Sequence, residues 1–222
     1  MAHRLKIGVD IDGVLITMDT KQYLEFCAKQ FGWNASYDVY VQTHSWIQAT
    51  GQTDDALISH AWGVYLETIE NAQQPIEGAH DVLRALGNSA DIYLITARPV
   101  DQLEATEAIL RKHLPDVKYI ELSMSNRENK IQPIIDFNID YYIDDSYSEI
   151  SAILENKNIQ TNIIPFPSFH ATTRWDGLED DRLIWLKAWD SVEVAVSDEE
   201  KRRVYNNAWE EIGNIIQRGK RI

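Results

Sequence analysis

Three short apolar runs, each followed directly by polar residues, constrain the fold of this chain more than any other feature of its sequence. A run of this kind is typical of a buried parallel strand, which delivers its last residues to the carboxyl edge of a sheet. Functional side chains gather at such edges. The sequence therefore predicts three strands that end together: Leu5–Val9 before Asp10-Ile11-Asp12-Gly13, Asp91–Ile95 before Thr96-Ala97-Arg98-Pro99, and Asp140–Ile143 before Asp144-Asp145-Ser146.

Segments with helical periodicity separate these runs, so strand and helix alternate along much of the chain. This alternation favours an α/β fold in which a mostly parallel sheet has helices on both faces. Two weaker apolar runs, Lys118–Leu122 and Asn162–Ile164, bring the expected number of strands to about five. The expected helices between the strands are His80–Leu86, Val100–His113 and Ile131–Phe137.

The segment Ile16–Gln74 interrupts the alternation and contains only helical patterns. We interpret it as a helical cap inserted after the first strand, with helices over Lys21–Phe31, Val39–Ala49 and Asp54–Ile69. The expected domains are a core of residues 1–15 and 76–175, a cap of residues 16–75 and a C-terminal helical extension of residues 176–222. The last helix either docks on the core or pairs two copies of the chain in a homo-oligomer.

The composition is that of a soluble globular protein with an acidic surface. The formal net charge of −14 and the pI near 4.8 disfavour nucleic acid polymers and anionic membranes as partners. We find no apolar run of about 18 residues and no signal peptide pattern. The single cysteine, Cys27, permits no intrachain disulfide and suits a reducing compartment. The expected location is therefore the cytoplasm.

Two acidic pairs stand at the ends of predicted strands. Asp10 and Asp12 are one residue apart, and Gly13 permits a sharp turn that aims backbone N–H groups at a ligand. Asp144 and Asp145 form the second pair. Taken alone, the first pair is also explained as a solvated acidic turn and the second as a helix N-cap. Taken together, they form a candidate site for a hard divalent cation such as Mg²⁺, which prefers oxygen ligands.

Thr96, Ala97 and Lys130 supply groups suited to an anionic ligand. The Thr96 hydroxyl and the Ala97 N–H can hold one phosphoryl oxygen, and the Lys130 ammonium suits a phosphate oxygen and a carboxylate. Alone, each is also explained as a turn residue or a solvated lysine. Arg98 is either a contact to phosphate or cap, or a helix-entry residue paired with local acids.

At four motifs the chain resembles the haloacid dehalogenase superfamily: Asp10-Ile11-Asp12-Gly13-Val14, Leu94-Ile95-Thr96, Lys130 and Ile143-Asp144-Asp145. The resemblance implies a Rossmann-like core with a helical cap between the first two motifs. It also implies that Asp10 is the nucleophile that accepts the phosphoryl group. Asp12 would protonate the leaving oxygen and then activate the water that hydrolyses the aspartyl phosphate.

The resemblance implies the remaining site residues as well. The implied Mg²⁺ ligands are the Asp10 carboxylate, the Asp12 backbone carbonyl and Asp145, with Asp144 reaching the ion through water. The phosphoryl oxygens would be held by Thr96, the Ala97 amide and Lys130, beside the turn at Gly13.

Asp12 distinguishes among the reactions of the superfamily, because members that resemble dehalogenases, phosphonatases or ion-pumping ATPases lack a carboxylate at this position. Within the superfamily the chain is similar to the deoxyribonucleotidase-like branch in its helical cap, in Pro75-Ile76-Glu77-Gly78-Ala79 and in Tyr142-Ile143-Asp144-Asp145. The resemblance therefore implies a Mg²⁺-dependent phosphomonoesterase acting on nucleoside 5′-monophosphates, with a deoxyribonucleotide preference. The alternatives are a phosphatase of another small phosphometabolite, such as a sugar phosphate, and a catalytically silent binding module.

The cap segment is rich in aromatic residues. Most of them are expected in the core of the cap, and one or two are expected to stack on the base if the substrate is a nucleotide. These residues are Phe31, Trp33, Tyr37, Tyr40, Trp46, Trp62 and Tyr65.

Overall fold

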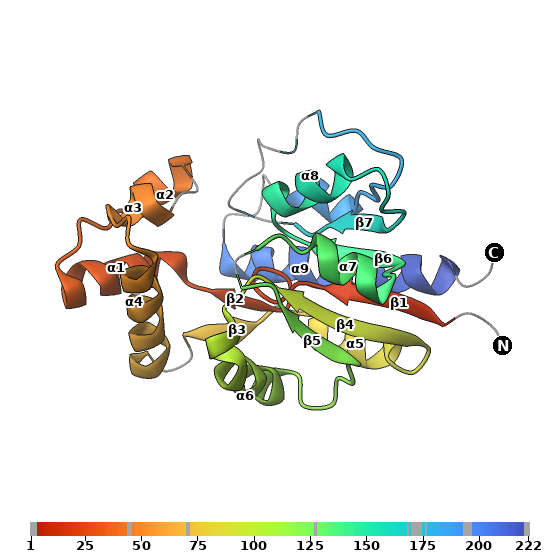
Figure 1. Ribbon diagram of the computed structural model, residues 1–222, viewed down its shortest axis with the longest axis horizontal. Helices are drawn as coiled ribbons and strands as arrows, with labels where there is room; N and C mark the ends of the chain where they lie inside the picture. Colours follow the sequence, from red (N-terminus) through yellow and green to blue (C-terminus); the bar gives the residue numbers. More distant parts are fainter. Residues whose placement is uncertain are drawn as a thin grey trace. The chain divides into compact units, whose positions relative to one another are not determined.

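The computed structural model describes residues 4–43, 46–69, 72–126, 128–167, 169, 175, 177–192 and 197–219. The chain divides into two compact units. The first, here called the core, consists of Met1–Ile16 and Pro75–Ile222 and carries the large sheet; the second, here called the cap, consists of Thr17–Gln74 and is mainly helical (Figure 1).

Five parallel strands form the sheet of the core. They are β1 (Leu5–Val9), β4 (Ala90–Thr96), β5 (Glu121–Met124), β6 (Tyr141–Asp144) and β7 (Asn162–Pro165). Their order is β5-β4-β1-β6-β7, which places β1 at the centre (Figure 1). Val9 on β1 pairs with Leu94 on one side and with Ile143 on the other. The predicted α/β fold with a parallel sheet is therefore confirmed.

Helices cover both faces of the sheet. Successive strand residues point to opposite faces, and accordingly Leu94 belongs to one buried apolar cluster whereas Tyr93 and Ile95 belong to another. The first cluster contains residues of α5 (Ala79–Leu86), α6 (Leu103–His113) and α9 (Asp198–Gly219). The second contains residues of α7 (Ile131–Phe137) and α8 (Tyr147–Glu155). Helices on both faces were predicted, and this prediction is confirmed.

Two elements of the core differ from the sequence-based expectation by more than one residue at a boundary. The strand expected from Lys118 begins only at Glu121, because Ile120 extends the apolar run in the sequence while its side chain is 62% exposed. The helix expected from Val100 starts as the 3₁₀ turn η1 (Val100–Gln102), and α6 follows it. No side chain caps this helix start, and a tighter first turn is a common solution there.

The described residues of the cap form four helices: α1 (Thr20–Phe31), α2 (Tyr37–Thr43), α3 (Trp46–Thr50) and α4 (Asp55–Thr68). The single helix expected over Val39–Ala49 is therefore wrong, because this stretch forms α2 and α3. The Thr43 hydroxyl donates to the Val39 carbonyl at 2.7 Å, a back-bond that disfavours continuation of a helix. Residues 44 and 45 lie outside the described part.

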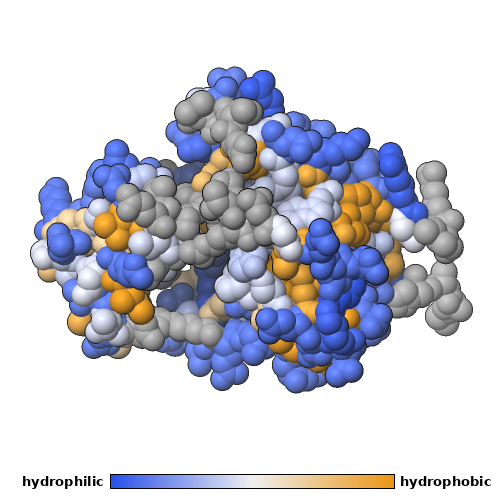
Figure 2. Space-filling model, turned by 90° about the horizontal axis from the view of Figure 1, so that it is seen from above, coloured by the Kyte–Doolittle hydropathy of each residue, from blue (hydrophilic) through white to orange (hydrophobic). Residues whose placement is uncertain are grey.

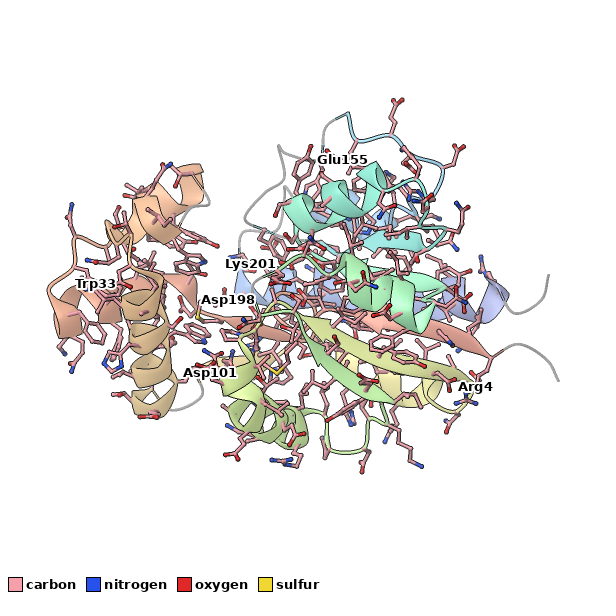
Figure 3. All side chains as sticks on the ribbon, viewed as in Figure 1. Arg4, Trp33, Asp101, Glu155, Asp198 and Lys201 are labelled. Carbon is pink, nitrogen blue, oxygen red and sulfur yellow. The ribbon has the colours of Figure 1, made fainter. Side chains whose placement is uncertain are left out.

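Aromatic side chains form the centre of the cap's own apolar core. The buried Tyr23 ring makes edge-to-face contacts with Trp46, Trp62 and Tyr65, at centroid distances of 5.4, 5.2 and 5.1 Å. Such pairs add about 0.5–1.5 kcal/mol each beyond the burial of their area. Tyr65 is fully buried, whereas Trp33, which is labelled in Figure 3, is only partly buried. Tyr65 thus serves packing, and Trp33 keeps exposed ring surface.

Two short strands carry the chain out of the core and back. They are β2 (Ile16–Met18) and β3 (Gln73–Pro75), which pair with each other in a two-stranded sheet. Next to this pair, the backbone N–H of Ile76 donates to the carbonyl of Leu15 at 2.8 Å. The two ends of the inserted segment are therefore hydrogen-bonded to each other.

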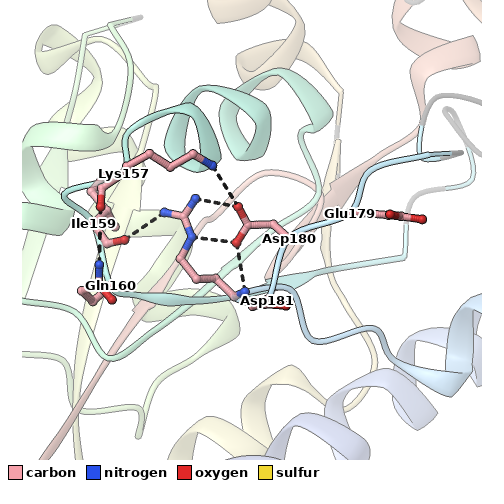
Figure 4. A pocket seen from close by; sticks show the side chains of 7 residues that line it. Lys157, Ile159, Gln160, Glu179, Asp180 and Asp181 are labelled. Atoms are coloured by element: carbon pink, nitrogen blue, oxygen red, sulfur yellow. Dashed lines mark hydrogen bonds and ion pairs between the residues drawn. The ribbon is translucent and has the colours of Figure 1, made fainter.

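An open polar pocket lies where α8 ends, with Lys157, Ile159, Gln160, Glu179, Asp180, Asp181 and Arg182 around it (Figure 4). The last carbonyls of a helix have no partner within the helix. The Arg182 guanidinium donates to three carbonyls there, those of Leu154, Asn156 and Ile159, at 2.5, 3.2 and 2.8 Å. Asp180 accepts from the same guanidinium at 2.8 and 2.9 Å. Arg182 therefore caps α8, and Asp180 orients it.

The surface is mainly polar. Figure 2 shows mostly hydrophilic side chains with smaller hydrophobic patches, and the exposed Val100, Ile120 and Trp185 belong to separate segments. Within the described ranges, no helix combines the length and the hydropathy that crossing a bilayer requires.

Candidate active site

The polar residues predicted from the sequence meet at the carboxyl edge of the sheet. Asp10 directly follows β1, Thr96 ends β4, and Asp144 ends β6. Because β4 and β6 pair with β1 on either side and in parallel, the ends of the three strands are neighbours. Lys130 directly precedes α7, and its ammonium contacts both Asp10 and Asp144. Residues from four separate parts of the sequence thus form one site.

Lys130 lies at the centre of this site. Its Nζ is 2.9 Å from Oδ1 of Asp10 and 2.8 Å from Oδ2 of Asp144. The Lys130 side chain is only 2% exposed. Burial by itself would lower the pKa of Lys130, but the two carboxylates reverse this effect and its pKa is raised. Lys130 is therefore a fixed positive charge beside two buried acids.

The Asp144 carboxylate accepts three hydrogen bonds. Oδ2 accepts from Lys130 and from the Tyr142 hydroxyl, at 2.8 and 2.6 Å, and Oδ1 accepts from the Ser146 N–H at 2.7 Å. Tyr142 belongs to the segment Tyr142-Ile143-Asp144-Asp145, but no role in the site was expected for it from the sequence. The sequence could have indicated this contact, because Tyr142 and Asp144 are two residues apart on β6 and residues two apart on a strand share a face. Gly8 makes room for the Tyr142 ring, since a Cβ there would lie 2.8 Å from it.

Three carboxylates converge beside Lys130. Ligand oxygens of Asp10, Asp144 and Asp145 lie within 4.8 Å of one another. Gly13 has φ +82°, and a Cβ at this position would lie 2.1 Å from Oδ2 of Asp145, so only glycine leaves space for that carboxylate. One ammonium does not balance three carboxylates, and oxygen donors are the ligands that Mg²⁺ prefers. The residues present therefore fit a hard divalent cation.

The pKa values of two of these acids reflect the same excess of negative charge. Burial raises the pKa of Asp10 to about 7; Lys130 opposes this shift, while Asp144 and Asp12 add to it. Burial also raises the pKa of Asp145 well above its ordinary value, and Asp144 is the next cause. Additional positive charge at this point would favour the ionised form of both acids.

Asp12 forms a two-point ion pair with Arg98. Nε of Arg98 donates to Oδ2 of Asp12 at 2.8 Å, and Nη2 donates to Oδ1 at 2.7 Å. The Arg98 side chain is 7% exposed and that of Asp12 is 48% exposed. Of the two alternatives for Arg98, the structure shows pairing with an acid, but this acid is 86 residues away in the sequence. The pairing therefore depends on the tertiary fold.

Thr96 and Ala97 occupy the turn after β4. The buried Thr96 hydroxyl accepts from the Arg98 N–H at 3.2 Å, so its own hydrogen can still be donated to a ligand. Ala97 is partly exposed. Across the site, the N–H of Gly13 donates to the Ile16 carbonyl at 2.8 Å and closes the turn after Asp12.

The C-terminal helix α9 packs behind the site, so its described part docks on the core. Nε1 of the fully buried Trp209 donates to the carbonyl of Val14 at 3.2 Å, directly after the turn that carries Asp12. The Tyr205 ring stacks on Phe166 with a centroid distance of 5.8 Å. The N–H of Phe166 in turn donates to the Asp144 carbonyl at 2.8 Å. Amphipathic periodicity alone did not reveal these contacts.

A sequence model of one protein family matches most of the chain. The family is described as 5′ nucleotidase, deoxy (pyrimidine), cytosolic type C protein, and the match covers residues 4–185. This range includes all four motifs of the site. Among curated protein sequences, none matches significantly.

Solved structures with a similar fold include a hydrolase and a putative mutase. A haloacid dehalogenase-like hydrolase from Streptococcus pneumoniae has 13% identity and a TM-score of 0.53, over 87% of this chain and 99% of that chain. A putative β-phosphoglucomutase from Thermotoga maritima has 16% identity and a TM-score of 0.53, over 85% and 96%. CbbY from Rhodobacter sphaeroides, solved with phosphate, has 15% identity and a TM-score of 0.53, over 82% and 94%. At these identities the likeness concerns the fold.

Proposed function

The chain belongs to the 5′ nucleotidase, deoxy (pyrimidine), cytosolic type C protein family, and on this premise we propose that it hydrolyses nucleoside 5′-monophosphates through a magnesium-dependent aspartyl-phosphate mechanism. As a member of this family, the chain is a phosphoric monoester hydrolase of the nucleotidase type. The observation that carries the proposed mechanism is the position of Lys130, whose ammonium joins the Asp10 and Asp144 carboxylates.

Asp10 is the nucleophile in the proposed mechanism. One of its carboxylate oxygens attacks phosphorus, the P–O bond to the nucleoside breaks, and an aspartyl phosphate forms. Lys130 holds Oδ1 of Asp10 at 2.9 Å and compensates the charge of the transferring group. The Thr96 hydroxyl and the Ala97 N–H bind the other phosphoryl oxygens.

Asp12 transfers protons in both halves of the reaction. It first gives a proton to the departing 5′ oxygen, so that the nucleoside leaves as a neutral alcohol. It then accepts a proton from the water that attacks the aspartyl phosphate, which restores the Asp10 carboxylate and releases phosphate. Its side chain is 48% exposed and is thus accessible to the alcohol and to water.

The Asp10 carboxylate, the Asp12 backbone carbonyl and Asp145 would hold Mg²⁺, which supplies positive charge to the transferring phosphoryl group. The excess of carboxylates over ammonium groups at the site supports this assignment. Asp144, whose oxygens accept from Lys130, Tyr142 and Ser146, contributes negative charge and holds Lys130 in place.

The substrate proposal rests on the family. The words 'deoxy' and 'pyrimidine' in the description of the family support a preference for deoxyribonucleotides over ribonucleotides and for pyrimidine over purine bases. The alternative is a sugar phosphate, which the name of the Thermotoga maritima structure suggests. That likeness concerns the fold, and we therefore treat the alternative as an outcome of the test.

A panel of phosphomonoesters tests the proposal. Purified protein with Mg²⁺ is assayed for phosphate release from deoxyribonucleoside and ribonucleoside 5′-monophosphates with pyrimidine and purine bases, and from hexose and pentose phosphates. We expect the highest kcat/KM for pyrimidine deoxyribonucleotides. A sugar phosphate that exceeds every nucleotide would replace the nucleotide substrate with the alternative.

The variant Asp10→Asn tests the mechanism in the same panel. An amide cannot act as the attacking carboxylate, so turnover should be abolished for every substrate. The control is mass spectrometry of the variant, which excludes deamidation back to aspartate. Residual turnover above a few per cent of the wild type, without deamidation, contradicts the covalent intermediate.

A further inference from the structure

We infer that Arg98 is a positioning residue that fixes the Asp12 carboxylate in the orientation for proton transfer to the leaving group. The inference rests on the proposed function, in which Asp12 is the general acid. It goes further because it assigns a role to Arg98, which does not belong to any of the four motifs.

The geometry of the Arg98–Asp12 pair restrains the carboxylate in two directions. Nε and Nη2 of the guanidinium donate to different oxygens of Asp12, at 2.8 and 2.7 Å. Two parallel hydrogen bonds from a planar fork fix both the position and the plane of a carboxylate, whereas a single point charge fixes neither. Because the Asp12 side chain is 48% exposed, surrounding atoms restrain it only in part. Arg98 supplies the missing restraint.

Arg98 is itself held in place. Its side chain is only 7% exposed, and Nη1 donates to Oγ1 of Thr106 at 3.2 Å. Thr106 is fully buried on α6, and the Arg98 backbone N–H is bonded to the Thr96 hydroxyl. The guanidinium is therefore anchored to α6 and to the end of β4, and it connects both to the turn after β1.

A direct contact between Arg98 and the substrate phosphate is the competing explanation. Nε and Nη2, the nitrogens that form the fork, both face Asp12, and Nη1 faces Thr106. The small exposed fraction of Arg98 leaves little guanidinium surface for an anion. The contacts therefore favour positioning over phosphate binding.

Two substrates that differ only in their leaving group separate these roles. Phenyl phosphate and p-nitrophenyl phosphate have similar size, but the nitro group stabilises the departing oxyanion and makes its protonation less important. Loss of a well-placed general acid therefore lowers kcat/KM more for phenyl phosphate. Loss of a phosphate contact, or a general loss of structure, lowers both values by the same factor.

The main variant is Arg98→Met, which removes the fork but keeps a long side chain. We expect kcat/KM for phenyl phosphate to fall by roughly 10- to 100-fold, the size of effect that misplacement of a reacting group produces, and kcat/KM for p-nitrophenyl phosphate to fall clearly less. Arg98→Lys keeps the charge without the fork and should behave like Arg98→Met. Wild-type behaviour of Arg98→Lys would overturn the role of the fork.

Thr106→Val is the second variant and keeps the test decisive if Arg98→Met does not fold. It removes only the anchor of Nη1, so the ratio of the two kcat/KM values should shift in the same direction by a smaller factor. In an Asp12→Asn background, Arg98→Met should cause no further shift of this ratio, because the two residues act as one unit. The inference is overturned if Arg98→Met lowers kcat/KM equally for both substrates. It is also overturned if Arg98→Met shifts the ratio further in the Asp12→Asn background.

Failure of the proposed function gives a different result. If Asp12→Asn leaves the ratio of the two substrates unchanged, Asp12 is not the general acid, and the mechanism and this inference both fail. If Asp12→Asn shifts the ratio and the Arg98 and Thr106 variants do not, only the inference fails.

Discussion

The ammonium nitrogen of Lys130 lies 2.9 Å from Oδ1 of Asp10, and both side chains are almost fully buried. Two residues 120 positions apart in the sequence thus form one charged unit, with Asp144 as the third member. The unit gives the carboxylate at the end of β1 a fixed orientation.

Replacing Lys130 by Met should lower kcat more than it raises KM. Negative charge develops on the phosphoryl oxygens during transfer, so the ammonium stabilises the transition state more than the bound substrate. We expect a loss of about 10²–10³-fold in kcat, as for removal of one such donor. Steady-state kinetics at saturating Mg²⁺ measures both constants. A change in KM alone would reassign Lys130 to substrate binding.

Replacing Tyr142 by Phe should weaken the charged unit of Lys130, Asp10 and Asp144. The 2.6 Å hydrogen bond to Asp144 is lost, which costs about 1–3 kcal/mol at a buried carboxylate and loosens the hold of Asp144 on Lys130. We expect lower thermal stability and a lower kcat. The matched control is Tyr93→Phe, since Tyr93 flanks Gly8 on the opposite side and stacks on Phe137. Equal behaviour of the two variants would speak against a role of Tyr142 in the site.

Mg²⁺ should stabilise the fold as well as support activity. A ligand that binds only the folded state raises its stability, and here the ion compensates the carboxylates of Asp10 and Asp145. The melting temperature should rise with Mg²⁺ for the wild type and much less for Asp145→Asn. Calcium, with its larger coordination shell, should support activity poorly. Asp101→Asn, on the exposed η1, is the control and should respond like the wild type (Figure 3).

Asp180→Asn should destabilise the protein at neutral pH by about 1–3 kcal/mol, because charge-assisted hydrogen bonds to Arg182 are lost. These bonds hold the pKa of Asp180 well below its ordinary value. The contribution is therefore complete above the unfolded pKa of about 3.9 and disappears as the pH falls toward the lower folded pKa. Urea unfolding at pH 7 and near pH 3 should show a shrinking difference from the wild type. The exposed Asp181→Asn is the control.

The cap supplies a test of the nucleotide substrate. Trp33 and Tyr37 are only partly buried, unlike Tyr65, which lies in the cap's own core. If one of them stacks on the base, its replacement by Ala should cost about 1–3 kcal/mol, which is about 5- to 150-fold in kcat/KM for a nucleotide. p-Nitrophenyl phosphate should be much less affected. If the ratio of the kcat/KM values for the two substrates is unchanged in both variants, neither Trp33 nor Tyr37 stacks on the base.

The positions of the motif residues follow from the sequence, because parallel strands that end in polar residues bring them to one edge. Asp10, Thr96 and Asp144 meet for this reason. The partner of Arg98 does not follow, since Asp12 and Thr106 come from different parts of the sequence and only the tertiary fold brings them to the guanidinium. Periodicity detects buried faces, but it does not identify the partner of a buried polar atom.

The same limit applies to the C-terminal helix. Its apolar face was visible in the sequence, whereas the hydrogen bond from Trp209 to the Val14 carbonyl depends on which surface that face meets. The Thr43 hydroxyl, which donates to the Val39 carbonyl within α2, is another polar contact that the apolar pattern does not register.

The hydrogen bond between Ile76 and Leu15, together with the pairing of β2 and β3, has a consequence for how this fold can change. The entropy lost in closing a loop depends on the distance along the chain between its ends. Here the two ends of the insertion are hydrogen-bonded to each other. The core therefore needs only that these two ends stay close together, and this condition does not depend on what the chain does between them. We therefore expect the cap to be an exchangeable module: replacing it with a different insertion, or with a tight turn, should leave the strand order of the core unchanged.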